Sequence, residues 1–151
     1  MSTHSVIEAR LDQAAEECER RGTHLSELRR SVFELLLAAD GPCTAYQLLE
    51  CLQGTRRGAA PPTIYRTLDF LVELGLVHKV ESLKAFVACL ESPQQAAEVQ
   101  FLICRRRGAA AELQDRVVPS ALSEAAAREG FQLARAVVEL DGICAHCRET
   151  P

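Results

Sequence analysis

Residues 61–75 read PPTIYRTLDFLVELG, and the predicted fold is built around this segment. Two prolines suit a first helical turn, whose N–H groups have no partner inside the helix. The closing glycine suits the left-handed residue that follows many helix ends. Between them, apolar residues recur at helical spacing: Ile64, Leu68, Leu71 and Leu74. The pattern predicts an amphipathic helix that buries these four side chains.

Further helix signals precede this stretch. Apolar residues at helical spacing predict a first helix over 6–21 and a second helix that is capped by Ser26. Thr44 and Gln47 have the spacing of a capping box, in which a hydroxyl and an amide each satisfy a backbone N–H. A short third helix is therefore expected over 44–53. A flexible connection carrying Arg56 and Arg57 is expected to join it to the helix at 62–74.

The hydrophobic period changes after Gly75. Residues 77–81 and 84–89 are two short strand-like runs around Ser82 and Leu83, which predicts a hairpin. Several short helices followed by a hairpin describe a winged helix-turn-helix, an architecture that places one helix in the major groove of DNA.

The remaining sequence predicts a second and smaller domain. Residues 91–98 are polar and are interpreted as a hinge between a DNA-binding domain over 1–90 and a domain over 99–151. The elements expected in the second domain are strands over 99–104, 109–113 and 132–140 and a helix over 115–129. A small unit with little core is best stabilised by pairing with a copy of itself. The predicted fold class is α+β, an N-terminal winged helix-turn-helix followed by a small α/β dimerisation domain.

Composition bounds the location of the protein. The chain has 151 residues, and no apolar run approaches the roughly 20 residues that cross a bilayer. Because the N-terminus lacks the pattern of a secretory signal, a cytoplasmic protein without a membrane partner is expected. Seven cysteines in such a protein are expected to be reduced thiols, some of which could bind metal.

The outer face of the predicted helix at 62–74 carries the candidate DNA contacts. Arg66 can bond a guanine edge with two N–H groups, and Tyr65 offers a flat ring and a hydroxyl. Thr63 lies on the same face. The alternative is that Tyr65 packs against a neighbouring helix and Arg66 is solvated. The net charge of −4 gives no help to DNA binding, so the prediction depends on the helices and hairpin together.

Several of these segments together resemble the ferric uptake regulator family. They are Leu25–Arg29, Thr44–Leu49, Pro61–Leu68, Phe101–Cys104, Gly130-Phe131 and the Cys144-x-x-Cys147 motif. Residues 74–82, LGLVHKVES, resemble the zinc-sensing branch in particular. The resemblance implies a homodimeric repressor that binds a palindromic double-stranded operator when metal is bound and controls genes of zinc or other metal homeostasis. It also implies that Tyr46, Tyr65 and Arg66 contact DNA.

The resemblance also implies a structural zinc that is held by two C-x-x-C pairs. The second pair is present as Cys144 and Cys147, whereas the first reads Cys104-Arg105-Arg106-Arg107. An arginine therefore stands where the family has its fourth thiolate. Three thiolates could still hold Zn²⁺ with His146 or water as the fourth ligand. Alternatively, the three are simply reduced thiols at a dimer edge.

A second, regulatory zinc site is implied in the same way. His78, Cys89 and Glu112 match three of its four ligands, but the expected linker histidine falls near Ala97 and residues 91–98 contain no histidine. Both implied sites thus lack one ligand. The sequence leaves three kinds of control open: a divergent zinc regulator, a regulator freed from metal, or a response to thiol oxidation.

Two other classes of function compete with the repressor. A degenerate paralogue could act by forming a heterodimer with an intact regulator. A thiol enzyme could use Cys144 and Cys147, but such a motif usually begins a helix that follows a strand. No helix is expected after Cys144, so the chain is not predicted to be an enzyme.

Overall fold

The structure is a computed structural model that describes residues 2–54, 60–89, 98–134 and 136–150. The chain divides into two compact units, residues 1–93 and 94–151, and each is described by itself. Apart from Glu98, the predicted hinge over 91–98 lies outside the described residues, and so do Arg56 and Arg57.

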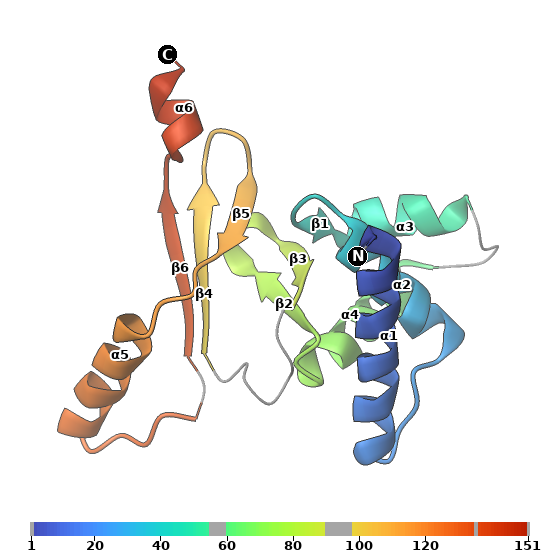
Figure 1. The fold of residues 1–151 in the computed structure, drawn as a ribbon, viewed down its shortest axis with the longest axis horizontal. Helices are drawn as coiled ribbons and strands as arrows, with labels where there is room; N and C mark the ends of the chain where they lie inside the picture. The colour runs from blue at the N-terminus through green and yellow to red at the C-terminus, as the bar shows by residue number, and fades with distance from the viewer. Residues whose placement is uncertain (1, 55–59, 90–97, 135, 151) are drawn as a thin grey trace. The chain divides into compact units, whose positions relative to one another are not determined.

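Within its described residues, the first unit contains four α-helices and a small sheet (Figure 1). Its helices are α1 (Thr3–Arg20), α2 (Glu27–Ala38), α3 (Ala45–Gln53) and α4 (Pro61–Glu73). Its strands are β1 (Cys43–Thr44), β2 (Val77–Val80) and β3 (Ala85–Ala88), in the antiparallel order β1-β3-β2. A 3₁₀ turn, η1 (Glu81–Leu83), joins β2 to β3. The helices and the hairpin β2–β3 form the predicted winged helix-turn-helix.

Side-chain caps set where α2 and α3 begin. The Ser26 hydroxyl accepts a hydrogen bond from the Arg29 N–H at the start of α2. Thr44 and Gln47 form the predicted capping box, with bonds of 3.1 Å and 2.9 Å between side chains and backbone N–H groups. After α4, Gly75 has a φ of 76°, a left-handed conformation that glycine adopts without a steric penalty. The structure therefore confirms the predicted cap at Ser26, the predicted capping box and the predicted left-handed glycine after α4.

One hydrophobic core holds the first unit together. Residues from all four helices and from both strands of the hairpin meet in it, and the largest fully buried side chain is Phe33 of α2. Arg29 of α2 places its guanidinium 3.5 Å from the centre of the Phe70 ring, so α4 is also fixed through a cation–π contact. This packing fixes which face of α4 points outward.

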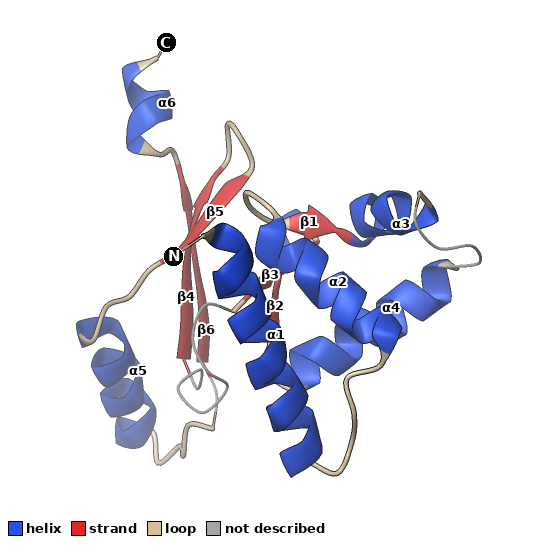
Figure 2. Cartoon of the chain, turned by 45° about the vertical axis from the view of Figure 1, so that its right-hand side comes forward, coloured by secondary structure: helices blue, strands red, loops and turns tan. Residues whose placement is uncertain are grey.

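The second unit is a three-stranded sheet with two helices. Its strands are β4 (Glu98–Cys104), β5 (Ala109–Glu112) and β6 (Ala136–Gly142), in the order β5-β4-β6. β4 is antiparallel to β5 and parallel to β6. Helix α5 (Val117–Arg128) precedes β6, and the short helix α6 (Ala145–Glu149) continues from its end (Figure 2).

The structure corrects three expectations. The strand expected over 132–140 runs from Ala136 to Gly142. Strand β1 was not predicted, because its two residues are too few to show alternation. Helix α6 follows Cys144, where no helix is expected from the sequence, because its five residues are too few for a helical period to be recognised.

We expect Thr44→Ala to lower the free energy of unfolding by about 1 kcal/mol, because it removes one half of the capping box. Urea denaturation at one fixed protein concentration measures this, since dimerisation would otherwise change the apparent stability. Ser5→Ala, at an exposed position of α1, is the matched control and should change the stability little. Equal stabilities of the two variants would show that the cap does not hold α3.

Candidate nucleic-acid interface and thiol cluster

Helix α4 has one buried face and one exposed face, as predicted. Ile64, Leu68 and Leu71 are at most 1% exposed, and Leu74 directly after the helix is also buried. Thr67 was not predicted on this face. Its hydroxyl donates a hydrogen bond of 2.8 Å to the Thr63 carbonyl. The buried hydroxyl is thus satisfied by the backbone of its own helix.

The outward face of α4 carries the predicted contacts Thr63, Tyr65 and Arg66, all of them exposed. Tyr65 is 55% exposed, although a tyrosine usually buries most of its ring in a packed domain. More than half of the Tyr65 side chain is therefore free to contact another molecule, and its role as a DNA contact stays a prediction.

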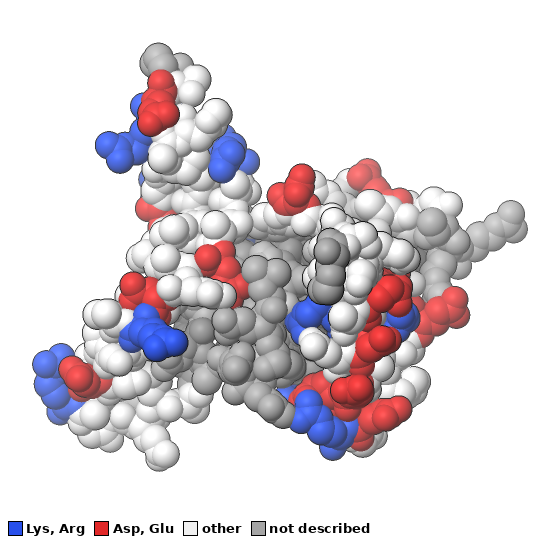
Figure 3. Space-filling model, viewed as in Figure 1, with Lys and Arg blue, Asp and Glu red and all other residues white. Residues whose placement is uncertain are grey.

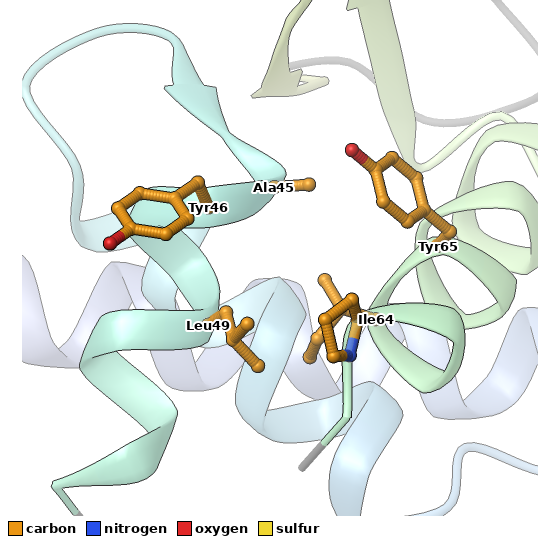
Figure 4. Close-up of a pocket in the computed structure, with 6 residues that line it drawn as sticks. Ala45, Tyr46, Leu49, Ile64 and Tyr65 are labelled. Carbon is orange, nitrogen blue, oxygen red and sulfur yellow. The ribbon is translucent and has the colours of Figure 1, made fainter.

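Tyr46 lies near the first turn of α3 and is 70% exposed. Helices α3 and α4 are in contact, and Tyr46 and Tyr65 line the same hollow of about 80 Å³ (Figure 4). The rest of its lining is apolar: Ala45, Leu49, Pro61 and Ile64. Two exposed tyrosines beside an apolar hollow form a surface that can contact both the edges and the methyl groups of bases.

Acidic side chains are concentrated on another element of the first unit. Asp12, Glu16 and Glu19 are exposed on α1, and Figure 3 shows acidic side chains gathered over this helix. Phosphates are repelled by such a surface. The exposed face of α1 is therefore poorly suited to nucleic acid, while the outward face of α4 carries both Arg66 and the exposed Asp69.

The three residues predicted to sense metal lie in different units. His78 on β2 is 3% exposed, and Cys89 directly after β3 is 1% exposed. Arg10 of α1 donates a hydrogen bond of 2.6 Å to the Cys89 carbonyl and so holds the end of the hairpin. Glu112 ends β5 in the second unit. A site that combines all three stays a prediction.

The second unit brings together Cys104, Cys144 and Cys147. Cys104 ends β4, Cys144 is the N-cap of α6, and Cys147 lies within α6. Their sulfur atoms all lie within 4.8 Å of one another, and the Cys104 and Cys147 sulfurs are 3.8 Å apart. Thiolates bound tetrahedrally to zinc at about 2.3 Å would also be about 3.8 Å apart. The donors and their spacing therefore fit a zinc ion.

Backbone N–H groups prepare one thiol of this cluster for metal. Hydrogen bonds from the N–H groups of Cys144 and Arg107 lower the pKa of Cys104 to about 6. Burial raises the pKa of Cys147 to about 11. Because a metal binds the thiolate and displaces the proton, Cys104 is ready to bind at neutral pH, whereas Cys147 must be deprotonated by the metal.

Arginines fasten the segment that carries two of the thiols. Arg105 pairs with Asp141 at 2.8 Å between Nε and Oδ2. Arg106 donates from Nη1 to the carbonyls of Cys147 at 2.7 Å and Thr150 at 3.1 Å. Sequence reasoning missed this clamp, because backbone carbonyls as partners leave no signal in residue types. Helix α6 is thus held to the end of β4 by hydrogen bonds as well as by the thiol cluster.

The presence of helix α6 bears on the alternative of a thiol enzyme, because the active thiols of such enzymes usually begin a helix. Cys144 does follow a strand and begin a helix, contrary to the expectation from sequence. The helix has only five residues, too few to carry the dipole of a full helix end.

No helix in the described part of the chain is long and apolar enough to cross a membrane.

The sequence pattern of the ferric uptake regulator family matches residues 20–141. The zinc uptake regulation protein of Escherichia coli (strain K12) is 40% identical over 139 residues, which make up 92% of this chain and 81% of that protein. The zinc uptake regulation protein of Mycobacterium tuberculosis (strain H37Rv) is 27% identical over 130 residues, or 84% of this chain and 96% of that protein.

Solved structures of similar chains agree with the fold. A zinc uptake regulator complexed with zinc and DNA has a TM-score of 0.84 at 39% identity, covering 99% of this chain and 97% of that one. The crystal structure of holo XcZur has a TM-score of 0.78 at 41% identity, covering 93% of this chain and 97% of that one. These structures confirm the predicted α+β fold class. On the extent of these matches, the chain belongs to the ferric uptake regulator family.

Proposed function

We propose that the protein is a zinc-responsive transcription repressor that binds a palindromic operator as a homodimer. The observation that carries this proposal is the exposed face formed by α3 and α4, on which Tyr46, Tyr65 and Arg66 stand over a fully packed core. The similarity to a zinc uptake regulator complexed with zinc and DNA supports it independently.

Helix α4 enters the major groove in this proposal. Arg66 donates two parallel hydrogen bonds to a guanine edge, which reads sequence, while Thr63 bonds a nearby phosphate or base. Tyr65 and Tyr46 place their rings against the groove wall on either side of the hollow between α3 and α4. The capping box of Thr44 and Gln47 fixes the turn from which Tyr46 projects.

The second unit provides the dimer interface. Helix α5 has no buried residue within the described chain, and large apolar side chains are exposed around it and on the sheet: Leu102, Val117, Leu122, Phe131, Val137 and Leu140. A single chain gains nothing by exposing this surface, whereas a second copy covers it. Because the two copies are related by a twofold axis, the DNA sequence that they read is a palindrome.

Zinc binds at two places in this proposal. The thiolates of Cys104, Cys144 and Cys147 hold one ion next to the dimer sheet, and His78, Cys89 and Glu112 are the residues that supply ligands to a second ion. Zinc binds the thiolate form of cysteine, the neutral form of histidine and the carboxylate form of glutamate, so each of these side chains binds in its deprotonated form. The thiol cluster and the zinc-binding relatives both favour this reading over a metal-independent paralogue.

Replacing Arg66 by alanine should weaken specific DNA binding by about 1–3 kcal/mol, or about 5- to 150-fold, because a bidentate base contact is lost. Fluorescence anisotropy measures this on a duplex that the protein has selected from a randomised pool. Arg20→Ala, at the exposed end of α1, removes the same charge away from α3, α4 and the proposed dimer surface, and Glu17 keeps its ion pair with Arg21. If Arg20→Ala weakens binding as much as Arg66→Ala does, Arg66 does not read the DNA.

Removing zinc should weaken binding to the same duplex by about 5- to 150-fold, the usual span of coupling between two ligand sites. The measurement compares zinc-loaded protein, chelator-treated protein and chelator-treated protein to which either zinc or magnesium is returned. Zinc alone should restore the affinity. Full affinity of metal-free protein, confirmed by elemental analysis, would establish the metal-independent alternative instead.

A further inference from the structure

The thiol cluster of the second unit offers three donors, whereas structural zinc sites have four. Among the described residues, no fourth histidine, cysteine, aspartate or glutamate has a ligand atom within the same 4.8 Å. A tetrahedral zinc ion bound by these three thiolates would therefore keep one position that no such described side chain fills.

Arg107, which stands where the fourth cysteine of the site would be, cannot act as a zinc ligand. Arg107 stands at the spacing from Cys104 that separates Cys147 from Cys144, and a guanidinium remains charged and has no lone pair to offer. Its side chain is exposed and lines a hollow of about 390 Å³. The other lining residues are Arg106, His146, Cys147 and Thr150. One of the three thiols, Cys147, therefore lines the same basic hollow as Arg107, and solvent can enter this hollow.

The neighbouring side chains do not close the site either. His146 lines the hollow and is exposed, but its ring nitrogens are not part of the cluster. Arg106 is engaged with the carbonyls of Cys147 and Thr150. This clamp holds α6 against the end of β4, so the three thiols stay together without a fourth one to close the tetrahedron.

We propose that the cluster is a three-thiolate zinc site whose fourth position takes a small external thiolate that also carries a carboxylate. The proposal rests on the zinc binding proposed above. The sulfur fills the open corner, while the carboxylate meets the guanidinium of Arg107. The incoming thiol gives its proton to solvent when it binds, and no electrons are transferred. The site thus differs from a closed structural site, which has no room for an outside ligand.

Cobalt(II) in place of zinc makes the fourth ligand visible, because the visible absorption of cobalt depends on its donors. The experiment uses the full chain in a Cys89→Ser background, so that the proposed site of His78, Cys89 and Glu112 no longer offers sulfur to cobalt. Three probes are titrated: mercaptosuccinate, 2-mercaptoethanol and succinate. We expect both thiols to shift the spectrum with saturation and succinate to leave it unchanged. Mercaptosuccinate should reach half-saturation at about fivefold lower concentration, the upper range for an exposed ion pair.

Arg107→Cys is the decisive variant, because it restores a fourth thiolate. Its spectrum should not respond to either thiol. It should also hold cobalt at least about 10-fold more tightly, because even the loss of a group that only orients a metal ligand changes metal affinity by about 10- to 100-fold. Arg107→Ala keeps the corner open, so both thiols should still shift its spectrum, while the advantage of mercaptosuccinate over 2-mercaptoethanol should fall by about fivefold. This second variant keeps the test decisive if Arg107→Cys fails to fold by circular dichroism.

Three results would overturn the proposal. One is a wild-type chain that binds no cobalt although Arg107→Cys does. Another is a wild-type spectrum that neither thiol changes, and a third is a response to thiols that is the same in Arg107→Cys. If His146→Ala gains a response that the wild type lacks, then His146 is the fourth ligand. None of these readouts involves DNA, so they stay separate from a failure of the repressor proposal.

Discussion

The burial of one face of α4 is the constraint on which the functional surface depends. Ile64, Leu68 and Leu71 are sealed in the core of the first unit, and the Arg29–Phe70 contact fixes the helix further along. A helix with such a face cannot rotate without exposing these side chains to water, which would cost about 1.5–3 kcal/mol for each. The opposite face must then point outward, and Tyr65 and Arg66 are on it because of their positions in the helical period.

The second unit satisfies a different constraint, which is to keep the chain end after β6 docked. In a closed site four thiolates would do this through one ion. This chain has an arginine at the fourth place and uses Arg105 and Arg106 to tie the segment 141–150 to the end of β4. The hydrogen-bond clamp and the open corner are thus two consequences of the same run, Arg105-Arg106-Arg107. Because the clamp needs no metal, docking of α6 and metal binding are less tightly coupled than in a four-thiolate site.

The first unit could be predicted from the sequence almost completely, because its helices begin and end at residues whose preferences are local. Ser26, Thr44, Pro61 and Gly75 each act on the backbone within a few residues. Strand β1 and helix α6 escaped prediction because they are too short to show a period and are held by contacts from distant parts of the chain.

The candidate sites divide in the same way. The exposed face of α4 follows from helical periodicity, so its residues could be named in advance. Cys104 and Cys147 lie 43 positions apart, and only the parallel pairing of β4 with β6 brings them together. The sequence motif indicated the cysteines through a resemblance, whereas the clamp of Arg106 on backbone carbonyls has no motif. Long-range backbone partners are the part of a site that residue types reveal least.

Photo-crosslinking distinguishes the outward face of α4 from other exposed faces as the surface that reads DNA. Benzoylphenylalanine is placed at Tyr65 on α4 or at Glu16 on the acidic face of α1, in zinc-loaded protein bound to a duplex selected from a randomised pool. Position 65 is expected to crosslink to bases of the duplex, and position 16 is not. Crosslinks from position 16 with none from position 65 would show that the outward face of α4 does not read the DNA.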